Sequence, residues 1–120
     1  MKKSLLFILG LLLFIFTSCE YKIIEPIIVE LPDEPVIFSE QVEPFLFDKC
    51  GSSCHSSQSP ILTIGNAYDN LIEGGYINTD NPPASEVYIK VNSGHHSSNP
   101  LSPEEMAYLL KWIEEGAIEN

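Results

Sequence analysis

The sequence predicts a small all-α domain of short helices, and three observations lead to this prediction. Apolar residues recur at helical spacing in several short segments after residue 38, separated by long loops. The last of these segments has both a complete helix start signal and a glycine stop signal. The apolar residues are few for a domain of this length, so its core is marginal unless a covalent or metal staple supports it.

The first 18 residues do not belong to that domain. Two lysines precede an apolar run from Leu5 to Phe16, which is as long as a signal-peptide core and shorter than the roughly 20 residues of a membrane span. Phe16-Thr17-Ser18-Cys19 then resembles the lipobox of bacterial lipoproteins. We expect residues 1–18 to be a lipoprotein signal peptide and Cys19 to carry lipid. The alternative is an uncleaved anchor with an incidental cysteine.

The chain is strongly acidic. Its net charge is −11, and cleavage would remove two of its six basic residues and none of its 17 acidic ones, which leaves −13. Phosphate backbones repel such a surface, so the composition argues against nucleic-acid binding. A partner protein with a basic docking patch would be attracted instead. We expect an exported protein, lipid-anchored to the bacterial cell envelope on the outer membrane or periplasmic side.

Residues 19–37 are predicted to form a tether. They carry three prolines and no glycine, which prevents a helix and favours a stiff, extended path. At about 3.3 Å per residue, this segment could hold the domain up to about 60 Å from the bilayer. An edge strand over residues 27–31 is the alternative.

The domain itself is expected over residues 38–120. The spacing of apolar residues predicts three short helices, at 43–50, 66–73 and 84–91. Ser39 is a candidate N-cap for the first, and Pro44 limits its length because proline is tolerated only in the first turn of a helix. The second ends at Gly74-Gly75.

The last helix has the clearest boundaries. Ser102 is its N-cap, Pro103 stands at N1, and Glu105 completes a capping box. Gly116 closes the helix as a left-handed residue. One face is apolar at positions i, i+3, i+4 and i+7, which are Met106, Leu109, Leu110 and Ile113.

The segment Cys50-Gly51-Ser52-Ser53-Cys54-His55 holds two thiols and an imidazole within six residues. Cys-x-x-Cys-His is the attachment signature of c-type haem, in which two thiols add to the vinyl groups and the histidine ligates the iron. Here three residues separate the cysteines in place of two. The loop must therefore bulge, and we expect Gly51 and the two serines to make this sterically easy.

The same residues also allow other interpretations. Cys50 and Cys54 could form a disulfide, whose short loop would stabilise the domain little. They could instead ligate zinc together with His55 and one of His95 and His96, which supplies the four ligands of a structural site.

The order of the segments along residues 38–120 resembles the small cytochrome c-like domains of exported bacterial proteins, including the group called planctomycete-type cytochrome c. The matching segments are 38–39, 42–46, the Cys/His motif, 60–62, 67–71, 85–91, 101–105 and 112–117. The resemblance implies a cytochrome c-like fold of short helices packed around a covalently attached haem c. It implies thioethers at Cys50 and Cys54, His55 as proximal iron ligand, and Pro60 as the proline whose carbonyl accepts from that histidine's other ring nitrogen.

The distal ligand departs from the family pattern. Relatives usually carry methionine in a Gly-x-Met-Pro-Pro stretch, whereas this chain reads Gly94-His95-His96-Ser97-Ser98. His96 stands where that methionine would be, so we predict bis-histidine iron with His96 as distal ligand and His95 as second choice. The alternative is that both are loop histidines in solvent. Met106, the one methionine left after cleavage, belongs to a helix face.

These observations predict a one-electron carrier with a single haem, and not an enzyme, because no Ser-His-Asp order or phosphate-binding loop occurs. Two other classes remain open. One is a haem-free binding or scaffold lipoprotein stapled by a Cys50–Cys54 disulfide or zinc. The other is a haem-based ligand sensor with a vacant distal position.

Overall fold

The computed structural model describes residues 29–95 and 98–120, and these residues form helices and loops without a strand. The prediction of an all-α domain is confirmed for this part of the chain. The predicted signal peptide, Cys19 and the first ten residues of the predicted tether lie outside the described residues. No helix within the described ranges is long and apolar enough to cross a membrane.

The first helical segment runs without interruption from Phe38 to Gly51. It consists of a π-helical turn η2 (Phe38–Val42), the α-helix α2 (Glu43–Leu46) and a second π-helical turn η3 (Phe47–Gly51). Pro44 lies in the first turn of α2, as expected. The N–H of Glu43 donates to the carbonyl of Phe38, five residues back. This wider turn lies directly before Pro44, which has no backbone N–H.

The prediction that Ser39 caps this helix is wrong. Ser39 lies inside η2, whose N-cap position is occupied by Ile37 without any side-chain cap. The Ser39 hydroxyl instead donates to the carbonyl of Asn120 at 2.8 Å. The contact joins residues far apart in sequence, so no local pattern could have indicated it.

The remaining helices follow the sequence prediction more closely. They are α3 (Ala67–Glu73), the 3₁₀ turn η4 (Pro82–Ala84), α4 (Glu86–Asn92) and α5 (Pro103–Glu114). The capping box between Ser102 and Glu105 is present, and Gly116 has a φ of 98°. α4 begins two residues later than expected, because Ala84 belongs to η4 and Ser85, with a ψ of 130°, is the N-cap.

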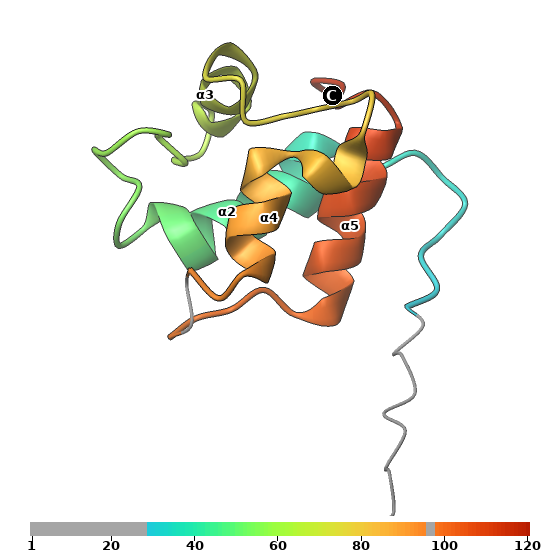
Figure 1. Ribbon diagram of the computed structural model, residues 1–120, viewed down its shortest axis with the longest axis horizontal. Helices are drawn as coiled ribbons and strands as arrows, with labels where there is room; N and C mark the ends of the chain where they lie inside the picture. The colour runs from blue at the N-terminus through green and yellow to red at the C-terminus, as the bar shows by residue number, and fades with distance from the viewer. Residues whose placement is uncertain (1–28, 96–97) are drawn as a thin grey trace, which may run out of the picture.

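The helices form one compact group in which α4 and α5 lie next to each other (Figure 1). The segment 38–51 packs behind them and contacts α5 through η2, while α3 lies at one end beside α2. A single apolar core runs between these elements. Its largest fully buried side chains are those of Trp112, Leu46, Leu71, Leu109 and Ile113.

Trp112 belongs to the protein core. Its ring packs against Phe38, with 4.7 Å between ring centroids, and makes an edge contact with Tyr68. The indole N–H donates to the carbonyl of Ile118 at 2.9 Å, which satisfies the one polar atom of the ring. This cluster joins the start of the domain to its C-terminal end.

The last residues of the predicted tether pack on α5 (Figure 1). The Lys111 ammonium donates to the carbonyls of Pro32 and Glu34, and the Glu115 carboxylate accepts from the N–H of Val36 at 2.8 Å. Val36 is buried. Helical structure begins at Phe38, but contacts of the domain extend back to Pro32. Residues 29–31 form no strand.

Candidate functional site

The Cys/His loop, residues 50–62, follows directly on the π-helical turn η3. Cys50 is the penultimate residue of η3 and is buried, whereas Cys54 is exposed. The N–H of Ser52 donates to the carbonyl of Phe47 at 2.7 Å, and the N–H of His55 donates to the carbonyl of Cys50 at 3.0 Å. Both bonds span five residues, one more than in an α-helix. The second of these wide turns encloses the three residues between the two cysteines.

Gly51 is needed at its position for a reason that the sequence did not indicate. We expected it to ease a bulge through conformational freedom, but it is not among the glycines with positive φ. A Cβ atom there would lie 2.0 Å from the backbone oxygen of Leu62 and 3.1 Å from the Phe47 ring. The two ends of the Cys/His loop approach so closely that only hydrogen fits between them.

The loop is also closed by hydrogen bonds around His55. The N–H of Leu62 donates to the carbonyl of His55 at 2.8 Å. Nδ1 of His55 lies 3.0 Å from the carbonyl oxygen of Pro60 and 3.4 Å from that of Gln58. A carbonyl can only accept, so Nδ1 is the donor in these contacts, and in the neutral ring Nε2 is then the unprotonated nitrogen. This is the tautomer in which Nε2 can ligate a metal.

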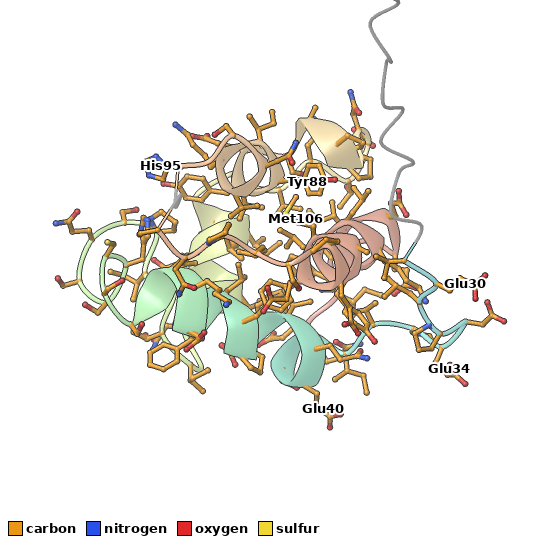
Figure 2. The ribbon with its side chains drawn as sticks, turned by 90° about the horizontal axis from the view of Figure 1, so that it is seen from below. Glu30, Glu34, Glu40, Tyr88, His95 and Met106 are labelled. Carbon is orange, nitrogen blue, oxygen red and sulfur yellow. The ribbon has the colours of Figure 1, made fainter. Side chains whose placement is uncertain are left out.

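A cleft of about 240 Å³ lies between the Cys/His loop and α4. Its apolar wall consists of Leu46, Pro60, Leu62, Val87 and Val91, and its polar lining consists of Cys50, His55, Ser59, Tyr76, Glu86, Lys90 and His95. Figure 2 shows His95 at the opposite end of the molecule from Glu30 and Glu34. The cleft is therefore remote from the side where the chain enters the domain.

The structure brings together four of the residues that the sequence singled out: Cys50, His55, Pro60 and His95 all line this cleft. Cys54 is exposed and does not line it. Met106 packs against the core, and Figure 2 shows it well away from His95. His96 lies outside the described residues, so its predicted role as distal ligand stays a prediction.

Four polar residues of the cleft were missed by the sequence analysis: Ser59, Tyr76, Glu86 and Lys90. Glu86 and Lys90 are four residues apart, and this spacing places them on one face of α4. Val87 and Val91 have the same four-residue spacing, and this apolar pair could have indicated which face of α4 turns toward the cleft. Nothing in the sequence around Tyr76 indicated that it would join them.

Both cysteines are free thiols in the structure. Within residues 29–95 and 98–120, no three His, Cys, Asp or Glu side chains converge as a metal site would require. Burial raises the pKa of the Cys50 thiol from 9.0 to about 11, with smaller contributions from Cys54 and the carboxylate of Glu105. Cys50 is therefore fully protonated at neutral pH.

The two thiols should react at very different rates in the haem-free, reduced chain. Because the thiolate is the reacting species, the raised pKa leaves Cys50 with about one hundredth of the thiolate of an ordinary cysteine at neutral pH. A thiolate of higher pKa is intrinsically more nucleophilic, which offsets part of this loss, so we expect iodoacetamide to alkylate the exposed Cys54 about tenfold faster than the buried Cys50 or more, measured by peptide mass spectrometry over time. Alkylation in denaturant is the control, where both should react alike. Equal rates in the native chain would contradict the buried position of Cys50.

Comparisons with protein-family models, with curated proteins and with solved structures found no match to this chain. The described residues thus define a small all-helical domain whose cleft gathers a buried thiol and two histidines.

Proposed function

We propose that this chain is an exported, lipid-anchored c-type cytochrome that carries one electron at a time on a single haem. The observation that supports it best is the lining of one cleft by Cys50, His55 and His95, with the His55 ring held on the Pro60 carbonyl. A thiol and an imidazole are the groups that haem attachment uses. The protein makes no bonds in a substrate, so we do not expect an enzyme.

The residues present fit this cofactor in their chemistry. Cys50 and Cys54 would form the two thioethers, Cys50 from inside the cleft and Cys54 from its exposed place on the loop. Nε2 of His55 would ligate the iron, and the bond from Nδ1 to Pro60 would fix the ring and increase its basicity. Bound haem supplies an iron that cycles between the ferric and ferrous states.

The apolar wall of the cleft would keep water from the bound cofactor on the side of α4, through Val87 and Val91. Low polarity around the metal and the choice of axial ligands are what set the reduction potential in such sites. An imidazole in place of a thioether as the distal ligand should lower that potential, because methionine ligation raises it. The acidic surface would direct this domain to a basic redox partner.

Coexpression of the full chain with a cytochrome c maturation system tests the proposal. The expected product has the mass of the lipoprotein plus one haem and a reduced spectrum with sharp bands that survive acid–acetone extraction, since thioethers are covalent. A matched Cys50→Ser, Cys54→Ser variant should lose the covalent haem. A wild-type product with the apoprotein mass and no Soret band would refute the cytochrome, and an oxidised-thiol mass or bound zinc would then identify the stapled scaffold.

The distal ligand is tested by single substitutions of the histidine pair. We propose that one of His95 and His96 would supply the second iron ligand beside His55; His95 lines the cleft, and His96 matches the family position. Replacing the ligand by alanine should convert a low-spin absorption spectrum to a high-spin one, whereas replacing its neighbour should leave the spectrum unchanged. If neither variant changes the spectrum, the bis-histidine assignment is wrong. A high-spin wild-type spectrum would instead indicate the vacant distal position of a ligand sensor.

A further inference from the structure

One lysine of the cleft has no ion-pair or hydrogen-bond partner among the described residues. Three lysines lie in the described residues, and two are engaged: Lys49 bonds Asn99 and lies 3.9 Å from Asp48, and Lys111 holds the backbone of the segment before Phe38. Within residues 29–95 and 98–120, the Lys90 ammonium makes no ion pair and no hydrogen bond. This lysine is the one that lines the cleft.

A second polar group accompanies it. Tyr76 lines the same cleft from the chain before α4, and its carbonyl accepts from the N–H of Val87 at 3.2 Å, which holds it at the start of that helix. Its hydroxyl has no hydrogen-bond partner among the described residues. An ammonium and a phenol O–H, both available as donors, are suited to a carboxylate.

The rest of the protein makes such a binding position unusual. With 17 acidic residues against six basic ones, most of the surface repels an anion. Glu86, one helical turn before Lys90, also lines the cleft and adds a repulsive charge there. A ligand with carboxylates could therefore enter in one orientation, with a carboxylate at the Lys90 side and away from Glu86.

We propose that Lys90, assisted by Tyr76, binds a propionate carboxylate of the haem and thereby sets which edge of the ring faces α4. This inference rests on the proposed function, since haem is the ligand that brings both a large apolar surface and two carboxylates to the cleft. Lys90 acts as a positioning residue: it contacts the periphery of the cofactor and takes no part in ligating the iron.

The test is the reduction midpoint of the attached haem as a function of pH, in wild type and in Lys90→Gln. Loss of the cation should lower the midpoint, because a positive charge near the ring favours the reduced form. Protonation of the propionate raises the midpoint at low pH. Without its counter-charge the propionate should protonate at a pH higher by about one unit or more, so this step should move up the pH scale by that amount.

Three further variants make the result specific. Lys90→Arg should retain the wild-type pH step, and Glu86→Gln should raise the midpoint, because it removes a negative charge from the same cleft. Lys49→Gln is the matched control: it removes the same charge next to Cys50, yet it should leave the pH step in place. An equal step in Lys90→Gln and Lys49→Gln would overturn the inference and leave only general charge effects. A wild-type chain without haem would instead refute the proposed function, so the two failures are distinguishable.

Discussion

Replacing Gly51 by alanine should be among the most destabilising substitutions in the domain. The new Cβ would lie 2.0 Å from the carbonyl oxygen of Leu62 and 2.9 Å from its carbonyl carbon. These are backbone atoms, so no side-chain rotation can relieve the clash. Overpacking of a core usually costs about 1–3 kcal/mol, and we expect Gly51→Ala to reach or exceed the upper end of that range. Urea unfolding of the two proteins, followed by circular dichroism, measures the difference.

Gly75→Ala is the matched control. Gly75 has a φ of 73° and nothing within 4 Å of its added Cβ, so alanine there meets conformational strain alone, worth about 1 kcal/mol. Gly51→Ala should therefore lower the free energy of unfolding more than Gly75→Ala does. Similar losses would show that the close approach of Gly51 to Leu62 is not what constrains the loop.

Gly51→Ala should also impair the proposed haem attachment. Leu62 donates its N–H to the carbonyl of His55, so a displaced Leu62 moves the histidine that the cleft presents. We expect the fraction of chains carrying covalent haem to fall in Gly51→Ala and to stay near the wild-type value in Gly75→Ala.

The second large effect is expected from His55, provided that the chain carries haem as proposed. His55→Ala removes the ring nitrogen that would ligate the iron and also the donor to the Pro60 carbonyl. The low-spin spectrum should be lost completely. His55→Asn separates the two roles, because the amide of asparagine can still donate to Pro60 from the place of Nδ1 but offers nothing in the place of Nε2.

We therefore expect His55→Asn to retain more of the wild-type free energy of unfolding than His55→Ala, while both lose the low-spin spectrum. Added imidazole should restore that spectrum in either variant by occupying the vacated position. The measurements are absorption spectra of both redox states and urea unfolding curves. A low-spin spectrum that persists in His55→Ala would assign the iron ligand to another residue.

The secondary structure could be predicted where short-range interactions decide it. α5 begins at Pro103 because Ser102 and Glu105 exchange hydrogen bonds over three residues, and such a signal is complete within the sequence itself. The end of α3 at Gly74 is equally local. The first helical segment could not be predicted as well, since Ser39 is engaged by Asn120 at the other end of the chain.

The features of the candidate site also fall into those that the sequence indicated and those that it did not. The order and adjacency of Cys50, Cys54 and His55 follow from the sequence alone. Their interpretation as a haem site stays a prediction. The π-helical turn η3, which carries Cys50, was not foreseen, because no residue pattern in the sequence indicated hydrogen bonds that span five residues.

The sequence by itself determined that two thiols and an imidazole stand together, that α5 starts and stops where it does, and that the domain is helical. Only the tertiary structure decided that His95 and Lys90 share a cleft with Cys50. It also decided that Gly51 must lack a side chain because Leu62 packs against it. Adjacency along the chain is set by covalent bonds, whereas these approaches depend on how α4 and the Cys/His loop pack across the core.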